Sequence, residues 1–159
     1  MKLIKKSIFK LFVTFTILST LQCSSSKYKL QETPAFQFDS VYFQEWYAGI
    51  KVGGTGINMY FPNLNDANTV TMDSVYFRNL KGKLVRGRSM YSAILKNRSP
   101  YDTTPINPSM KPAFKLLASE CVVSYIEKGE IKYFKLKNIN EREGVYYEDG
   151  PPTTMATVD

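Results

Sequence analysis

The chain has 159 residues, of which 43% are apolar, with a formal net charge of +7 and no histidine. This composition is typical of a globular protein and excludes a disordered or collagen-like chain. The absence of histidine excludes Ser-His-Asp and Cys-His catalysis and metal sites with histidine ligands. Four of the 21 basic residues lie in the first 22 positions, which hold no acid, so the remainder is nearly balanced, with 17 basic and 14 acidic residues.

The first 22 residues have the pattern of a signal peptide helix. Lysines at positions 2, 5, 6 and 10 precede an apolar stretch over residues 11–21. Such a stretch reaches only about 16 Å as a helix, roughly half the thickness of a bilayer core. It is therefore too short for a permanent membrane span and fits the apolar region of a secretory signal.

Cys23 directly follows this stretch and precedes three serines. The arrangement resembles the signal peptide of bacterial lipoproteins, in the looser form found in Bacteroidota, with Gln22 in the position usually held by a small residue. The segment 46–49 (Trp-Tyr-Ala-Gly) is also similar to small Bacteroidota lipoproteins, which implies no activity. The resemblance implies that Cys23 is acylated and becomes the first residue of the mature protein, so that its acyl chains anchor the protein without a transmembrane helix. The alternative is an ordinary cleaved signal with an incidental cysteine.

The resemblance also implies a location and a domain plan. Because Ser24 follows the cysteine and no acidic run comes after it, we expect the outer membrane of a bacterial envelope, on its periplasmic face. The plan is a signal peptide (1–22), a lipidated cysteine with a flexible tether (23–35), one β domain (36–149) and a flexible tail (150–159). Cys121 is then the only free cysteine, so no intramolecular disulfide is expected.

Alternating apolar residues and many aromatics predict an all-β domain, a small, mostly antiparallel β-sandwich or a partly open barrel. The clearest alternation runs from Glu120 to Leu136, where a Gly129-Glu130 turn predicts a hairpin with Tyr125 opposite Phe134. Cys121 lies on the same apolar face as Tyr125 and is predicted to be buried.

A second predicted hairpin has its loop at residues 81–83. It places Arg78 opposite Arg86 and Tyr76 opposite Arg88 on one sheet face. The first strand of this hairpin belongs to a repeat, because residues 39–43 (Asp-Ser-Val-Tyr-Phe) recur at 73–77. The repeat indicates a duplicated β-hairpin, with convergent strand chemistry as the alternative.

Residues 74–101 hold no acid, and they supply the candidate binding residues Tyr76, Arg78, Arg86 and Arg88. Like charges paired across a sheet are unfavourable, which indicates an anionic partner such as a phospholipid headgroup, a lipopolysaccharide phosphate, an acidic glycan or an acidic protein. The alternative is a solvated strand face that keeps the protein soluble. Nucleic acid is not expected as a partner of an exported, nearly neutral domain.

Other motifs predict structure rather than chemistry. The glycine-rich residues 53–56 lack the Lys-Ser/Thr of a phosphate-binding loop and predict a turn. The oxygen-rich residues Asn63, Asn65, Asp66 and Asn68 predict Asx turns, since one carboxylate is too few for calcium. An aromatic platform for sugars, or ordinary packing, is predicted for Trp46, Tyr42, Tyr47 and Tyr60.

The function expected from these features is that of a non-enzymatic, lipid-anchored envelope protein. It would contact a protein or an anionic envelope polymer through its sheet surface. One alternative is a β-barrel carrier of a lipid or small apolar ligand, and a second is an enzyme of unrecognised type. No catalytic residue, metal ligand or cofactor is assigned.

Overall fold

The computed structural model describes residues 28–50, 53–65, 70–99, 101 and 112–148. Within these ranges the strands are β1 (Leu30–Gln31), β2 (Tyr42–Ala48), β3 (Thr55–Pro62), β4 (Val70–Phe77), β5 (Leu80–Lys83), β6 (Val85–Arg86), β7 (Met90–Lys96), β8 (Cys121–Glu127), β9 (Glu130–Leu136) and β10 (Asn140–Tyr147). None of the described segments is a helix with the length and apolar composition needed to cross a membrane. The predicted signal peptide, Cys23 and the predicted tail lie outside the described residues.

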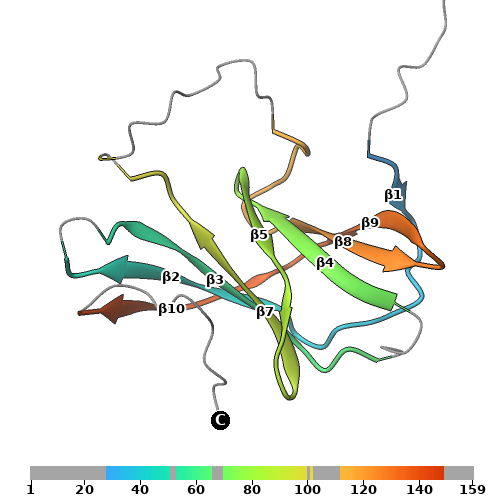
Figure 1. Cartoon of the computed structure of the whole chain (residues 1–159), viewed down its shortest axis with the longest axis horizontal. Coiled ribbons are helices and arrows are strands. Elements are labelled where there is room, and N and C mark those ends of the chain that lie inside the picture. Colours follow the sequence, from blue (N-terminus) through green and yellow to red (C-terminus); the bar gives the residue numbers. More distant parts are fainter. Residues whose placement is uncertain (1–27, 51–52, 66–69, 100, 102–111, 149–159) are drawn as a thin grey trace, which may run out of the picture.

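The strands form two five-stranded sheets (Figure 1). The first sheet has the order β1-β9-β8-β4-β5 and the second has the order β10-β2-β3-β7-β6. Edge strand β1 is parallel to β9 and edge strand β10 is parallel to β2, whereas the other pairs are antiparallel. The predicted all-β fold is confirmed; the two sheets do not close into a barrel, and their arrangement is consistent with the sandwich form of the prediction.

Strand β1 corrects the predicted domain boundary. Leu30 pairs with Tyr133 and Gln31 pairs with Phe134. The predicted flexible tether of residues 23–35 therefore includes a short strand, because the backbone groups of residues 30 and 31 find partners on the edge of β9.

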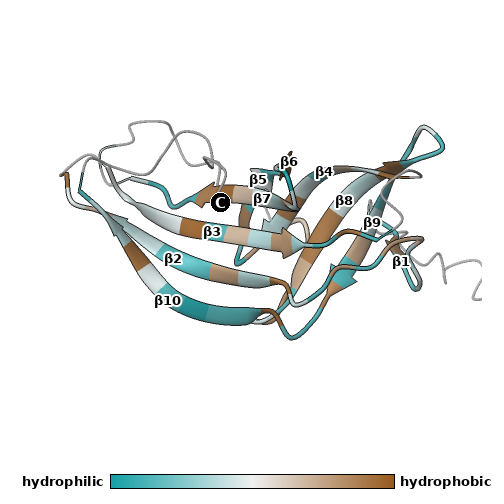
Figure 2. Cartoon of the chain, turned by 90° about the horizontal axis from the view of Figure 1, so that it is seen from below, coloured by the Kyte–Doolittle hydropathy of each residue, from teal (hydrophilic) through white to brown (hydrophobic). Residues whose placement is uncertain are grey.

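Hydrophobic residues recur along the strands of both sheets (Figure 2), and their side chains form one core. Phe43 and Met59 come from the second sheet and Val75, Phe77 and Val123 from the first, and all five are buried in a single cluster. Each buried side chain of this size contributes about 1.5–3 kcal/mol through removal of apolar surface from water. The inner faces of the two sheets thus hold each other together.

The segment before β2 completes the core at the side where the sheets separate. The ring of Phe36 lies 4.8 Å from the ring of Tyr125 on β8, and the ring of Phe38 lies 5.2 Å from that of Phe61 on β3. The two phenylalanines are only two residues apart but contact different sheets, so this segment packs against both sheets in the core.

The β8–β9 hairpin has the predicted faces but a different turn. Glu127 pairs with Glu130, so the turn is Lys128-Gly129 rather than Gly129-Glu130. Both turn residues have positive φ, 52° and 82°, which is the requirement of a type I′ turn. Because the register differs from the prediction by two residues, Tyr125 faces Lys132 instead of Phe134, while every side chain stays on its predicted face. Cys121 is buried, as predicted.

The predicted β4–β5 hairpin is wrong in its turn and its partners. The turn is Arg78-Asn79, again with positive φ at both residues, and Tyr76 pairs with Lys81 rather than Arg88. The predicted loop residues 81–83 lie inside β5. A lysine-glycine-lysine sequence resembles a turn, but tertiary pairing with β4 uses it as a strand.

Residues 80–86 pass from the first sheet to the second. The crossing occurs at Leu84, which is buried and donates its backbone N–H to the carbonyl oxygen of Asp73 at 2.9 Å. Asp73 is the extra residue of a β-bulge in β4. Its carboxylate accepts hydrogen bonds from Lys83 Nζ at 2.6 Å and from the buried Ser124 hydroxyl at 2.8 Å. A bulge bends its strand, and here it provides the site where the chain changes sheets.

The two copies of the sequence repeat lie in opposite sheets. Each copy leads into an antiparallel pair, β2 with β3 and β4 with β5. The equivalent phenylalanines, Phe43 and Phe77, meet in the core with ring centroids 4.9 Å apart. The repeat thus supplies an equivalent core phenylalanine to each of the two sheets.

We predict that the Asp73 carboxylate stabilises the fold in a pH-dependent manner. The hydrogen bond from Lys83 lowers the pKa of this carboxyl, assisted by Ser124. The stabilisation is therefore present above the ordinary pKa of about 3.9 and is lost as the pH falls through the lower folded-state value. Asp73→Asn should reduce the free energy of unfolding at neutral pH by about 1 kcal/mol.

Urea unfolding followed by Trp46 fluorescence measures this effect. The difference between the wild-type protein and Asp73→Asn should shrink steadily below about pH 4. A difference that stays constant down to about pH 2 would contradict a role for the ionised carboxylate.

Candidate functional site

The four candidate binding residues do not share one face. Arg78 lies at the β4–β5 turn, and Tyr76 lies on the outer face of the first sheet. Arg86 and Arg88 lie at the other end of the crossing segment, before β7 (Figure 1). The structure therefore brings Arg86 and Arg88 together but separates them from Arg78 and Tyr76.

Arg78 joins the two sheets instead of facing a partner. Its Nη1 lies 2.8 Å from Glu45 Oε1 on β2, and its Nη2 lies 3.6 Å from Glu141 Oε2 on β10. The guanidinium carbon is 4.6 Å from the ring centroid of Phe43 and 5.1 Å from that of Phe77. A guanidinium can stack on aromatic rings and pair with carboxylates at the same time. At Arg78 both kinds of contact are made with groups of the protein's own core and neighbouring strands.

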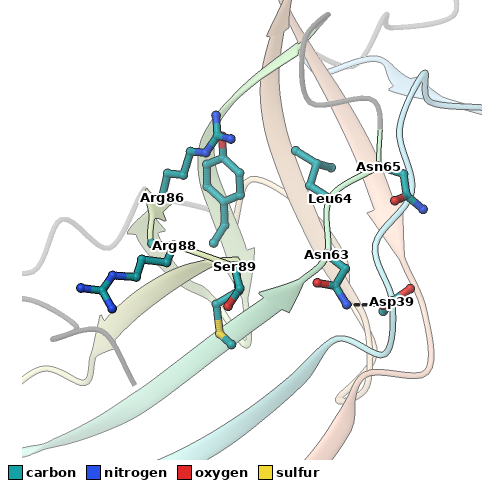
Figure 3. A pocket seen from close by; sticks show the side chains of 10 residues that line it. Asp39, Asn63, Leu64, Asn65, Arg86, Arg88 and Ser89 are labelled. Atoms are coloured by element: carbon teal, nitrogen blue, oxygen red, sulfur yellow. Dashed lines mark hydrogen bonds between the residues drawn. The ribbon is translucent and has the colours of Figure 1, made fainter. Parts of the chain in front are cut away.

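Arg86 and Arg88 line a groove of about 460 Å³ (Figure 3). Figure 3 shows the two arginines on one side, with Asn63, Leu64, Asn65 and Asp39 on the other. We call this site the arginine groove and define it by Arg86, Arg88, Ser89, Asp39, Asn63 and Asn65.

The walls of the arginine groove are held by backbone bonds. Gly87 N–H donates to Met90 O at 2.8 Å and closes the turn that carries the arginines. Asn63 N–H donates to Ser89 O at 3.3 Å, which joins the two walls. Asn63 Nδ2 donates to Asp39 Oδ2 at 2.7 Å. The groove therefore combines two exposed arginines with an amide and a carboxylate that are bonded to each other. In Figure 3 the guanidinium of Arg88 points away from the wall that carries Asn63 and Asp39.

Tyr76 belongs to a different surface, built from aromatic rings. Its ring lies 5.0 Å from Phe114 and 6.5 Å from Tyr133, and the ring of Tyr28 is 5.0 Å from Phe114 and 5.1 Å from Tyr133. Lys81 Nζ is 5.3 Å from the Tyr76 centroid. Beside this cluster is a groove of about 650 Å³, which we call the aromatic groove and define by Tyr28, Tyr76, Leu80, Lys81, Phe114 and Leu116.

The surroundings of this aromatic surface shift the pKa values of two groups. Interaction with Tyr76 raises the pKa of Lys81, so Lys81 carries its charge throughout the physiological range. Burial raises the pKa of the Tyr133 hydroxyl. The aromatic groove therefore presents one firmly charged ammonium group beside the neutral hydroxyl of Tyr133.

The predicted aromatic platform is divided between two sheet faces. Trp46, Tyr42 and Tyr60 share the outer face of the second sheet, while Tyr47 lies on the opposite face and donates its hydroxyl to Glu45 at 2.8 Å. Tyr42 stacks on Tyr60 at 4.7 Å, and the guanidinium of Arg142 lies 3.5 Å from the Tyr42 centroid. Because β3 and β10 flank β2 on either side, Tyr42 is sandwiched between these two groups.

Trp46 packs against the backbone at Gly56. A Cβ atom at position 56 would collide with the indole, so only glycine allows this arrangement. Trp46 is buried, and its Nε1 has no hydrogen-bond partner among the described residues. The packing alternative therefore describes Trp46 better than an open sugar platform does.

The oxygen-rich loop contributes to the arginine groove rather than to a metal site. Asn63 adopts a positive φ of 44°, and Asn65 N–H donates to Gln37 O at 3.0 Å, whereas Asp66 and Asn68 lie outside the described residues. No cluster of three or more Asp, Glu or Cys side chains that could hold a metal ion occurs in the part of the chain that the structure describes.

Sequence reasoning did not identify several residues of these grooves. Asp39 joins the arginine groove from a loop 47 residues before Arg86, and Phe114 joins the aromatic groove from a loop 38 residues after Tyr76. No local pattern relates such residues, since their proximity results from the pairing of strands distant in sequence. The sequence predicts Lys81 as a loop residue, whereas the turn at Arg78-Asn79 places it opposite Tyr76.

We predict that Arg78 is a structural residue. Arg78→Met removes the ion pair with Glu45 and the cation–π contacts, and should lower the free energy of unfolding by about 1–2 kcal/mol. The matched control Arg86→Met removes an exposed arginine and should change it by less than about 0.5 kcal/mol. Thermal or urea unfolding compares the two, and equal effects would contradict the structural role of Arg78.

Comparison with known proteins does not place this chain in a family. No protein-family model matches it, and searches of curated proteins and of solved structures found no match. The functional conclusion therefore depends on the residues of the chain and their geometry.

Proposed function

We propose that the protein is a non-catalytic lipoprotein of the bacterial cell envelope. Its leader carries the chain across the inner membrane, and acyl chains on Cys23 hold the β-sandwich at the outer membrane, facing the periplasm. Its arginine groove binds an anionic polymer of the envelope, for which an acidic glycan is the best chemical match. The protein needs no cofactor for this role.

The observation that carries the proposal is the exposed pair Arg86 and Arg88 beside fixed polar groups. Guanidinium groups form bidentate hydrogen bonds with carboxylates and phosphates. The amides of Asn63 and Asn65 and the carboxylate of Asp39 can bind sugar hydroxyls, as donors and acceptors respectively. An acidic sugar offers both an anion and neighbouring hydroxyls, so its chemistry matches both walls of the groove.

A polymer fits this groove better than an acidic protein does. Stable protein–protein interfaces have an apolar centre with aromatic residues. The arginine groove is largely polar, with Leu64, Met90 and Tyr91 as its apolar members. Its polar lining is suited to a chain of hydroxylated, charged units.

The carrier alternative receives less support from the packing. A β-barrel carrier would hold its ligand in an apolar space between the strands. The inner faces of the described strands instead form one packed cluster that includes Phe43, Phe61 and Phe77. Binding at the surface therefore agrees better with this sandwich.

We predict that charge reversal in the arginine groove weakens glycan binding. The double variant Arg86→Glu/Arg88→Glu should bind polygalacturonate about tenfold more weakly than the wild-type protein, since two attractive contacts become repulsive. The affinity of the wild-type protein should also fall as salt is raised. Isothermal titration calorimetry measures both effects.

The control variant is Lys96→Glu/Lys137→Glu, which changes the net charge by the same amount at exposed lysines outside the groove. It should retain nearly wild-type binding, and neutral dextran should not bind to any of the proteins. If both double variants lose affinity equally, the attraction is a general charge effect and the groove is not the site.

We predict that Cys23→Ser abolishes membrane attachment. Without the thiol no acyl chain can be added, so the protein should move from the membrane to the soluble fraction of the envelope. Fractionation and mass spectrometry of the mature N-terminus measure this, with Ser24→Ala as the control. Unchanged membrane association of Cys23→Ser would rule out acylation at this residue.

A further inference from the structure

The N-terminal end of the described chain lies in the aromatic groove. Tyr28 packs on Phe114 and Tyr133, with ring centroids 5.0 and 5.1 Å away. Two residues later Leu30 enters β1, which pairs with the edge of β9. The position of Tyr28 is therefore set by both ring packing and backbone pairing.

Chain length limits how far this surface can lie from Cys23. Cys23 precedes Tyr28 by five residues, and an extended chain reaches at most about 3.6 Å per residue, or roughly 18 Å in total. The turn between β6 and β7, which carries Arg88, lies at the bottom of Figure 1, whereas the β4–β5 turn and the start of β1 lie in its upper part. An anchor on Cys23 therefore holds the aromatic groove, and not the arginine groove, close to the bilayer.

The chemistry of the aromatic surface suits the lipid interface. Tyrosine prefers the headgroup layer, where its ring is in an apolar setting and its hydroxyl remains hydrated. The surface carries Tyr28 and Tyr76, and beyond Leu116 the side chain of Leu117 is 68% exposed.

The positive charge of Lys81 also suits an anionic lipid surface. Lys81 lies at the aromatic groove, where an ammonium group can attract anionic headgroups. Two other lysines of the outer face of the first sheet are already paired, Lys83 with Asp73 and Lys135 with Glu120. The carboxylates of Asp73 and Glu120 are thus neutralised by their own partners.

We propose that the aromatic groove and Leu117 lie against the lipid headgroup layer, which orients the sandwich on the membrane and turns the arginine groove outward. This inference rests on the proposed anchoring at Cys23. It extends that proposal from an attached domain to a domain with a defined membrane face, whose partner is a bilayer containing phosphatidylethanolamine and phosphatidylglycerol.

The experiment uses the full acylated protein, purified from membranes and reconstituted on such vesicles. Leu117→Cys carries an environment-sensitive fluorophore, and Val85→Cys, at a site that is 56% exposed beside the arginine groove, is the matched control. The labelling is selective because Cys121 is fully buried and burial raises the pKa of its thiol, while Cys23 is acylated.

The measurements are vesicle flotation and quenching of the fluorophore by lipid-attached nitroxide. We expect a blue shift and strong quenching at Leu117→Cys and neither at Val85→Cys. Equal quenching of both labels on floating protein would overturn the proposed face while leaving the anchor intact. Failure to float would overturn the anchor, and the proposed orientation with it.

A charge variant tests the same face independently. Lys81→Glu should lower the quenching of the Leu117→Cys label about fivefold on vesicles with phosphatidylglycerol, since one lysine near an anionic surface contributes a factor of that order. The control Lys96→Glu should leave it unchanged. If Lys81→Glu leaves the quenching of this label unchanged, the lipid surface is not the occupant of the aromatic groove. The same conclusion follows if the label is shielded from water only when a protein partner is added.

Discussion

The architecture depends on one crossing, where residues 80–86 leave the first sheet and join the second. The bulge at Asp73 makes this possible, since its carbonyl accepts the N–H of Leu84 and its carboxylate holds Lys83 and Ser124. Both hydrogen-bonding groups of Asp73 are thus used at the point where the chain changes sheets.

This crossing also determines what the basic residues can do. Lys81 lies before the crossing point at Leu84, beside aromatic rings, and Arg86 lies after that point, beside amide groups. Arg78 stays at the first turn, where Glu45 and the core phenylalanines occupy it. The basic residues that are close in sequence thus have three different surroundings. Arg78 is part of the core packing, Lys81 lies on the aromatic surface, and Arg86 lies in the polar arginine groove.

The two grooves fit a protein that is attached at one end and binds at the other. Tyr28 connects the N-terminal segment to the aromatic groove, and Arg86 and Arg88 lie at the far end of the crossing. In the proposed orientation, tyrosines and Lys81 meet the lipid headgroups while the arginines face the periplasm. Electrostatic attraction would act at both ends, but the apolar rings confine lipid contact to one of them.

Local pattern was sufficient for the all-β class, for the burial of Cys121 and for the faces of β8 and β9. Alternation has a period of two, so even a turn misplaced by one residue, which shifts the register by two, leaves each side chain on its proper face. Such local patterns do not determine which strands pair with each other. The Arg78-Asn79 turn, the parallel strand β1 and the contact between Tyr28 and Phe114 all depend on residues distant in sequence. Only the tertiary structure decided which arginines meet, because like charges adjacent in the chain separate when their strands enter different sheets.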